Sequence, residues 1–331
     1  MTENRYWIQL ATEQFPPSDL VRQAVAAEAA GFDALNVSDH FQPWWEPGES
    51  GQAWILLGAI GQATKRIPIG TGVTAPVHRY NPAVVAQAFA TLEQLFPGRA
   101  FLGLGSGEAL NEVPTGMEWP SPRGQVARLE EALEIITRLL RGERVDHNGE
   151  FFRTNAAYLH TKGQRRPPIY ISAFGPGAAR LAARFGDGMW TLADPSLAPR
   201  VVEAYREACE GLRRAPGEII LQSGFSWADE DQAALDGARV WKAAQPREYY
   251  SDDWHDPAKM HAKAASEISD EQFCRSYIIS SNADEHAERV RGIEKMGSTV
   301  VCLQNASGAD PHGALRVYGD KVLPRLRGKR L

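Results

Sequence analysis

The stretch "YWIQLATEQFPPSDLVRQAVAAEAAGFDALNVSD" (residues 6–39) carries the pattern that decides the fold. It opens with the short apolar run "YWIQLA" and continues with a helical pattern at 18–31. A second short apolar run, "ALNVSD", follows at 34–39. Alternation of short apolar runs with longer helical patterns predicts parallel strands joined by right-handed crossovers.

The same alternation continues to the end of the chain. Strand candidates, each followed by a helical pattern, lie at residues 6–11, 34–39, 67–73, 100–107, 168–174, 187–192, 218–227 and 299–305. Eight such units in 331 residues favour one (β/α)₈ barrel, a TIM barrel, over an open doubly wound sheet with a second domain. We therefore predict a single α/β domain over residues 1–331.

Two stretches interrupt this alternation and are predicted to be insertions. Residues 142–167 contain "DHNGEFFR", which is typical of a hairpin. Residues 228–275 are polar, aromatic and charged, which suits a lid or a helical excursion over one face of the barrel.

The composition excludes several function classes. The net charge is −5 and no run of lysine or arginine exceeds two residues, which argues against nucleic-acid or membrane-surface partners. The N-terminus lacks an apolar signal segment and no stretch of 18 apolar residues occurs, so we expect a cytoplasmic protein. Cys209, Cys274 and Cys302 are widely spaced and form no metal-ligand pattern. We expect three reduced, buried thiols and no metal site.

Active sites of parallel barrels lie at the carboxyl ends of the strands, so polar residues just after each strand are the first candidates. This filter selects Glu13, Asp39, His40, Trp44, Trp45, the 72–76 turn, Ser106, Gly107, Glu108, Asn111 and the 174–177 turn. A histidine can act as a general acid or base, and an adjacent carboxylate can orient its imidazole or a ligand, which makes His40 and Asp39 a candidate pair. The alternative is a helix-capping Asp39. Trp44 and Trp45 could wall a pocket, or one of them could serve packing.

Gly103, Gly105 and Gly107 alternate along the fourth strand candidate and so share one face. Two interpretations remain open for this bare face. It could admit a flat ligand against the backbone, or it could permit close packing inside the barrel. Glu108, directly beyond, would project from the strand end toward a polar ring edge.

The segment "SAFGPGAAR" (172–180) passes from a strand into a helix through two glycines and a proline. Such a turn exposes backbone N–H groups at a helix N-terminus, where a phosphate or carboxylate can bind. The spacing matches no nucleotide-binding motif, so the signal is weak alone. His78, Arg79 and Arg180 could help to neutralise an anion there.

Three segments, "SDHFQPW" (38–44), 70–112 and 168–188, closely resemble the deazaflavin-dependent glucose-6-phosphate dehydrogenases of the bacterial luciferase-like superfamily. The resemblance runs across essentially the whole chain. It implies a TIM barrel, usually a homodimer, that binds the 8-hydroxy-5-deazaflavin coenzyme F420 with its ring at the carboxyl-end mouth of the barrel.

The resemblance also implies roles for matching residues. His40 would be the catalytic acid or base with Trp44 beside it, Glu108 the second catalytic residue near the pyrimidine edge, and Glu13 a further active-site carboxylate. Gly72–Val73 matches a non-prolyl cis peptide that backs the deazaflavin ring, and Ala75 stands where the family has a threonine. The full set of matched cofactor contacts is Asp39, Gly72, Val73, Ala75, Ser106, Gly107, Asn111, Phe174, Gly175, Gly177 and Ala178.

The substrate positions depart from the family. Its sugar-phosphate enzymes use two lysines and an arginine, and the matching residues here are Pro195, Ser251 and Ser276, none of them cationic. Lys263 or Arg275 could restore one contact through a shifted alignment. Each missing charge-assisted hydrogen bond is worth about 1.5–3 kcal/mol, so we predict weak phosphate-ester binding. With Leu192 and Trp44, the three matching residues form the candidate substrate contacts.

These observations predict hydride transfer between the CH–OH carbon of a sugar or other small hydroxy compound and C5 of F420. Two alternatives stay open: an FMN-dependent monooxygenase of the same superfamily, and a reductase that runs the reaction in the opposite direction. A cofactor-free binding barrel explains neither the acids nor the histidine at the strand ends.

Overall fold

The computed structural model describes residues 4–328, and its centre is a closed ring of parallel strands. The ring consists of β1 (Arg5–Leu10), β2 (Ala34–Val37), β3 (Ile69–Thr71), β4 (Ala100–Leu104), β7 (Ile169–Ser172), β8 (Gly188–Leu192), β9 (Glu218–Ser226) and β11 (Val300–Asn305). The sheet closes because β9 pairs with both β8 and β11 while β11 pairs with β1. All eight strands fall within or beside the predicted runs, and the TIM-barrel prediction is confirmed.

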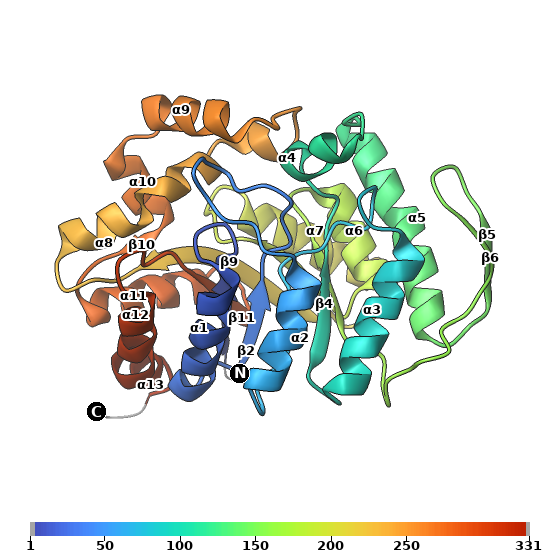
Figure 1. The fold of residues 1–331 in the computed structure, drawn as a ribbon, viewed down its shortest axis with the longest axis horizontal. Helices are drawn as coiled ribbons and strands as arrows, with labels where there is room; N and C mark the ends of the chain where they lie inside the picture. The colour runs from blue at the N-terminus through green and yellow to red at the C-terminus, as the bar shows by residue number, and fades with distance from the viewer. Residues whose placement is uncertain (1–3, 329–331) are drawn as a thin grey trace.

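Helices surround the ring on its outside (Figure 1). They are α1 (Pro17–Ala30), α2 (Ala53–Ala63), α3 (Pro82–Leu95), α5 (Pro122–Leu140), α6 (Pro176–Phe185), α7 (Ala198–Gly211) and α11 (Ala283–Glu294), then α12 (Pro311–Val317), the π-helical η4 (Tyr318–Val322) and α13 (Leu323–Leu326). Local chemistry sets their ends. Gly31 stops α1 because its φ of 86° lets its N–H reach the last carbonyls of the helix.

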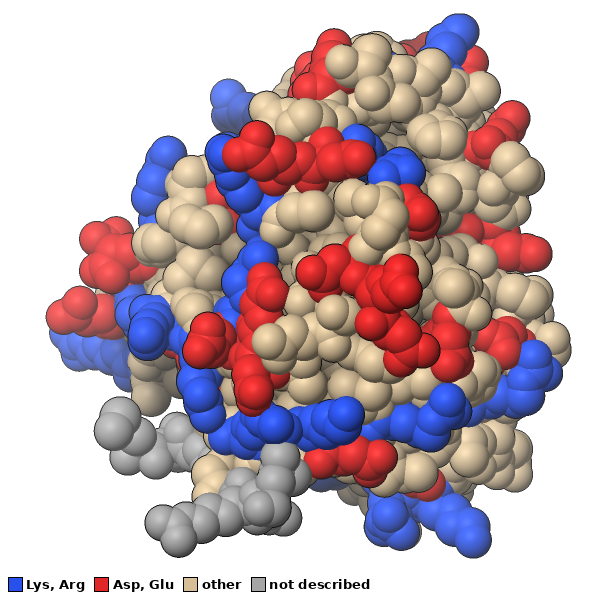
Figure 2. All heavy atoms as spheres, turned by 90° about the vertical axis from the view of Figure 1, so that its left-hand side faces the viewer, with Lys and Arg blue, Asp and Glu red and all other residues tan. Residues whose placement is uncertain are grey.

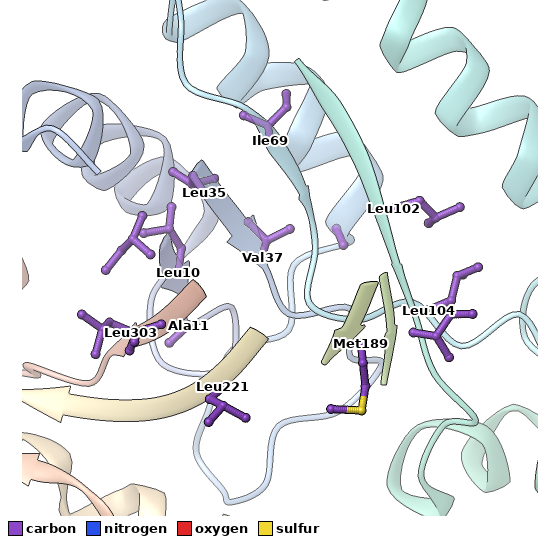
Figure 3. Close-up of a cluster of buried hydrophobic side chains, with 14 of the residues drawn as sticks. Leu10, Ala11, Leu35, Val37, Ile69, Leu102, Leu104, Met189, Leu221 and Leu303 are labelled. Carbon is purple, nitrogen blue, oxygen red and sulfur yellow. The ribbon is translucent and has the colours of Figure 1, made fainter. Parts of the chain in front are cut away.

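The core has two parts because side chains alternate along each strand. Leu35 and Val37 point from β2 toward the helices, as do leucines of other strands in Figure 3, whereas Asn36 between them faces the barrel interior. Inside the barrel, the Trp7 ring lies 4.9 Å from Phe101 and 5.3 Å from Tyr170. These aromatic side chains fill the interior near the strand starts.

The first insertion is the predicted hairpin. It consists of β5 (Val145–Asn148) and β6 (Arg153–Ala157) and extends beside the barrel (Figure 1). Glu131 on α5 accepts hydrogen bonds from the backbone N–H groups of Phe151 (3.1 Å) and Phe152 (2.7 Å). Its carboxylate also lies 3.0 Å from His147 Nε2. One side chain thus anchors the hairpin to the helix.

The second insertion is a helical excursion, as the sequence predicts. It contains α8 (Asp231–Ala238), the 3₁₀ segments η2 (Arg239–Ala244) and η3 (Arg247–Tyr250), α9 (Pro257–Glu267) and α10 (Asp270–Ser276). A two-residue strand, β10 (Ile278–Ile279), then pairs with β9. Figure 1 shows α9 on the same side of the barrel as α4 (Ala109–Glu112), which follows the end of β4.

The three cysteines are all free. Cys209 and Cys302 are buried as expected, but the prediction of a buried thiol is wrong for Cys274, which is half-buried because α10 lies at the surface. Over residues 4–328, no helix combines the length and apolar character needed to cross a membrane. Within the same residues, no group of three or more His, Cys, Asp or Glu side chains could hold a metal ion.

Candidate active site

His40 and Glu13 meet at the ends of the neighbouring strands β1 and β2. The distance from His40 Nδ1 to Glu13 Oε1 is 3.6 Å, and the two side chains are only 12% and 2% exposed. Glu13 is held in turn, because its Oε2 accepts a 2.9 Å hydrogen bond from Ser38 Oγ. Within residues 4–328, Nδ1 has no hydrogen-bond partner. The Glu13 carboxylate therefore faces Nδ1 of His40 and does not contact Nε2.

The two tryptophans after β2 have different environments. The Trp44 ring centroid lies 5.3 Å from His40 and 5.2 Å from Tyr250. Trp45 instead packs edge-on against Trp241 of the second insertion, 4.9 Å away. Trp44 thus borders the histidine, and Trp45 serves packing, which resolves the alternatives for this pair.

Asp39 is buried and its carboxylate oxygens both have partners. Oδ2 accepts a 2.6 Å hydrogen bond from Thr74 Oγ1, and Oδ1 accepts one of 3.0 Å from the Tyr80 hydroxyl. Burial, reinforced by the charge of Asp39, raises the pKa of Tyr80 to about 12. The capping alternative for Asp39 is wrong, because the first turn of α2 is capped by Gln52.

Arg79 bridges two buried carboxylates. Its Nη1 lies 3.4 Å from Asp39 Oδ1, and its Nε lies 3.5 Å from Glu112 Oε1. Burial raises the pKa of Glu112, and the positive charge of Arg79 opposes that shift. The expectation that Arg79 helps to neutralise a bound anion is therefore wrong, since its charge is already matched inside the protein.

The glycine face of β4 is filled by protein rather than left bare. A Cβ on Gly103 would lie 2.1 Å from the Thr71 carbonyl oxygen, and one on Gly105 would lie 2.7 Å from Val73 Cγ2. The Gly72–Val73 peptide bond is cis, as the resemblance implies. Close packing is thus the correct interpretation for Gly103 and Gly105, because the bulge at Val73 occupies the space.

Gly107 departs from the predicted strand altogether. The strand ends at Leu104, and Gly107 adopts a φ of +78°, which favours glycine over other residues. Its missing side chain would meet Ala75, whose Cβ would be 3.1 Å away. Ser106 and Gly107 are half-buried in the turn that leads to Glu108.

Glu108 opens α4 and is tied to the loop after β2. Its Oε2 accepts a 3.1 Å hydrogen bond from Asn111 Nδ2, while Asn111 Oδ1 accepts one of 2.8 Å from the Phe41 backbone N–H. Asn111 is buried and Glu108 is half-buried. Asn111 thus positions the acid of one loop against the loop that carries His40.

The 174–177 turn forms the N-terminus of α6, a helix of 10 residues. Gly175 is its N-cap, no side chain caps the first turn, and a Cβ at Gly175 would meet nothing within 4 Å. Gly177 and Ala178 follow in the first turn, and Phe174 is 40% exposed. The turn therefore offers uncapped backbone N–H groups to an anion.

The three substrate positions lie in residues 245–251 of the second insertion or beside contacts with them. Ser276 Oγ donates to Gln245 Oε1 (2.7 Å), and the Ser251 carbonyl accepts from Trp119 Nε1 (3.0 Å). Arg247 contacts Asp194, the residue before Pro195 and two positions after Leu192 at the end of β8.

The cations near these positions in sequence are paired with carboxylates. Lys263 Nζ lies 3.3 Å from Glu248 and 2.5 Å from Glu267. Arg275 Nη2 lies 2.5 Å from Glu271. The structure therefore gives no sign that either cation replaces a phosphate-binding contact.

Comparison with known proteins identifies the family. Residues 1–299 match the family described as luciferase-like monooxygenase. The chain belongs to this luciferase-like family. It is 39% identical over 329 residues to an F420-dependent glucose-6-phosphate dehydrogenase of Nakamurella multipartita, covering 98% of this chain and 96% of that protein. The enzyme of that name from Mycolicibacterium smegmatis is 37% identical, with 99% of both chains covered.

Solved structures of similar fold are also known. An F420-dependent secondary alcohol dehydrogenase in complex with an F420-acetone adduct has a TM-score of 0.94 to this chain at 32% identity, with 98% and 99% of the two chains covered. A coenzyme F420-dependent tetrahydromethanopterin reductase from Methanopyrus kandleri shares the fold, with a TM-score of 0.81 at 19% identity. The family resemblance inferred from the sequence is confirmed.

Several residues of the site were missed by the sequence reasoning. Ser38, Tyr80 and Glu112 contact predicted site residues, and Tyr250 reaches Trp44 from the second insertion. Ser38 directly follows the end of β2, whereas Tyr80 and Glu112 lie nine and eight residues after the ends of β3 and β4, so a wider window after each strand would have found them. No local signal marks Tyr250.

Proposed function

We propose that the protein is an F420-dependent dehydrogenase that transfers hydride between the CH–OH carbon of a small, uncharged hydroxy compound and C5 of the deazaflavin. The observation that carries this proposal is the His40–Glu13 pair, with Nδ1 3.6 Å from a buried carboxylate at the carboxyl ends of the strands. A carboxylate at Nδ1 orients the imidazole and leaves Nε2 for proton transfer. The names of the relatives support F420 as the cofactor.

The residues present fit this cofactor. The uncapped N-terminus of α6, open beside Gly175, suits its phosphate, and the bulge at Val73 offers a backing for a planar ring. We assign further contacts with the cofactor to Asp39, Ala75, Ser106 and Gly107, which lie in the loops after β2, β3 and β4. When bound, F420 supplies C5 as the atom that accepts or donates the hydride.

We assign the proton chemistry to two groups of this chain. His40 takes the proton of the substrate hydroxyl while the C–H bond of the carbon that bears this hydroxyl breaks. The hydrogen leaves that carbon as hydride, and the alcohol becomes a carbonyl. Glu13 keeps the imidazole of His40 in position and stabilises the positive charge that the imidazole gains. Glu108, held by Asn111 at 3.1 Å, would lie at the N1 edge of the deazaflavin ring, where its carboxyl group would donate a proton or stabilise the reduced ring.

The substrate class follows from the paired cations. Lys263, Arg247 and Arg275 each contact a carboxylate, and Pro195, Ser251 and Ser276 carry no charge. A phosphate ester would find no free cation among these side chains to match its charge. The similar structure of an F420-dependent secondary alcohol dehydrogenase supports a short secondary alcohol, rather than a sugar phosphate, as the substrate.

The test is a substrate screen of the purified protein with oxidised F420. We expect loss of the deazaflavin absorbance with 2-propanol and related secondary alcohols, and weak turnover of glucose and glucose 6-phosphate. A parallel assay with reduced FMN and oxygen should show no product. Efficient turnover of glucose 6-phosphate would contradict the substrate class, and oxygen-dependent turnover with FMN would contradict the cofactor.

We further propose that the protein is a homodimer that pairs through the outer faces of α1 and α2. Helix α2, "AWILLGAIGQA", has no charged residue, and its Ile55 is 77% exposed. A groove of 360 Å³ beside Ile55 is lined by Pro17, Ser18, Val21, Gln52, Ile55, Leu56 and Ala59. The face in Figure 2, by contrast, carries many charged side chains of both signs. An uncharged helix face favours burial against another chain.

Light scattering after size exclusion tests the dimer. The wild type should elute as a dimer, and Ile55→Glu should shift it toward the monomer because a buried carboxylate without a partner opposes association. Leu212→Glu, at an exposed apolar residue just after α7, is the matched control and should leave the mass unchanged. A monomeric wild type would contradict the proposal.

A further inference from the structure

The second insertion brings one aromatic side chain to the site. The Tyr250 ring centroid lies 5.2 Å from Trp44 and 5.4 Å from Phe174. Trp44 in turn lies 5.3 Å from His40. Tyr250 is therefore separated from the proposed base by a single ring, although it comes from a segment outside the barrel.

Tyr250 lies in η3, which packs against α4, the helix that begins just after Glu108. Burial raises the pKa of its phenol, and the negative charges of Glu108 and Glu13 raise it further. These two acids follow different strands, β4 and β1. The Tyr250 hydroxyl donates a 2.8 Å hydrogen bond to the Ala244 carbonyl within its own segment. The hydroxyl is thus engaged, and the ring is the part that borders the other aromatic side chains.

The segment that carries Tyr250 is fixed from several sides. The Ser251 carbonyl accepts hydrogen bonds from Trp119 Nε1 (3.0 Å) and Gln125 Nε2 (3.3 Å). Gln42, two residues after His40, donates to the His255 carbonyl at 3.1 Å. Contacts just after Tyr250 hold the backbone, so the ring is positioned before any substrate arrives.

We propose that Tyr250 determines substrate size: its ring forms an apolar wall that limits the substituents on the carbinol carbon. This inference rests on the proposed function, because it concerns the substrate of the same site. Tyr250 precedes Ser251, the position at which the resemblance places a phosphate-binding cation. An aromatic wall beside an uncharged residue favours a short apolar substituent over an ionised one. A single methylene in such a contact changes kcat/KM by about 10–200-fold.

The experiment compares Tyr250→Ala with the wild type on 2-propanol and 2-hexanol, using oxidised F420. The wild type should prefer 2-propanol. Removal of the ring should move the ratio of the two kcat/KM values toward 2-hexanol by at least about tenfold, mainly through KM. Tyr250→Phe keeps the ring and should restore the wild-type ratio. Tyr158→Ala in the β6–β7 connection is the matched control. An unchanged ratio in Tyr250→Ala would overturn the proposal.

A binding measurement separates this inference from the proposed function. Dissociation constants of acetone and 2-hexanone, measured by NMR titration of the protein without turnover, should show the same change of preference in Tyr250→Ala. If the wild type oxidises none of the alcohols, the proposed function fails, while the ketone ratio still supports or overturns the role of Tyr250. Should Tyr250→Ala fail to fold by circular dichroism, Tyr250→Leu replaces it and keeps part of the apolar volume.

Discussion

Two arginine–aspartate contacts distinguish the barrel mouth from the second insertion. At the mouth, the side chains of Arg79 and Asp39 are 10% and 1% exposed, and Arg79 also reaches Glu112. In the insertion, Arg247 contacts Asp194 with side-chain exposures of 66% and 33%. Water screens the second pair and not the first. The comparison teaches that charge matching is a structural requirement at the barrel mouth, whereas the insertion depends on hydrogen bonds to its backbone.

Two histidine–glutamate contacts have different proposed roles: His40–Glu13 serves catalysis, and His147–Glu131 anchors the hairpin. Breaking the His40–Glu13 contact should have the largest effect. His40→Ala removes the proposed proton acceptor and should lower turnover about 10²–10⁴-fold, with F420 binding nearly unchanged. Steady-state kinetics and cofactor titration measure both. His147→Ala removes the partner of Glu131 in the hairpin and should leave turnover unchanged. A fully active His40→Ala variant would contradict the catalytic assignment.

Arg79→Met should cause the largest loss of stability. It leaves Asp39 and Glu112 buried without their cation, so the free energy of unfolding should fall by about 3–5 kcal/mol. Urea denaturation followed by circular dichroism measures this change. A loss below about 1 kcal/mol, as expected for a surface pair, would show that the barrel mouth is screened like the insertion.

Glu131→Gln should produce a smaller, pH-dependent loss. Burial acts to raise the pKa of Glu131, but hydrogen bonds from the Phe152 and Phe151 N–H groups and His147 outweigh it, so the pKa lies below 4.5. A lowered carboxyl pKa stabilises the fold above the unfolded-state value and ceases to do so as the pH falls through the folded-state value. The variant should lose about 1.5–3 kcal/mol at neutral pH.

Urea denaturation at several pH values measures this difference. The gap between the wild type and Glu131→Gln should shrink as the pH falls below 4.5, the ordinary value for this group. A gap that stays constant or widens at low pH would contradict the anchoring role of the Glu131 carboxylate.

Arg247→Met should have the smallest effect. Because its pair with Asp194 is largely exposed, the free energy of unfolding should change by no more than about 1 kcal/mol, and added salt should reduce the difference further. The same urea titration measures it. A loss equal to that of Arg79→Met would remove the distinction between the two regions.

Much of the site could be predicted because parallel strands bring their carboxyl ends together. Glu13 and His40 lie 27 positions apart in the chain, yet β1 and β2 are neighbours, so strand assignment alone predicts their meeting. The hairpin and the cis bond at Gly72–Val73 were likewise predicted, the latter from the resemblance. The glycine face could not be settled, because whether a ligand or Val73 fills it depends on the path of a different loop.

The sequence by itself determined the barrel, the strand ends that carry the candidate acids and the histidine, and the family. These depend on local periodicity and on the order of strands, which a short window of residues specifies. Only the tertiary structure decided that Arg79 pairs with the two carboxylates of Asp39 and Glu112 and that Tyr250 contacts Trp44. Such contacts join residues far apart in the chain, as Trp119 and Ser251 do over 132 positions. Their partners are set by how the insertion packs, and no local pattern records that packing.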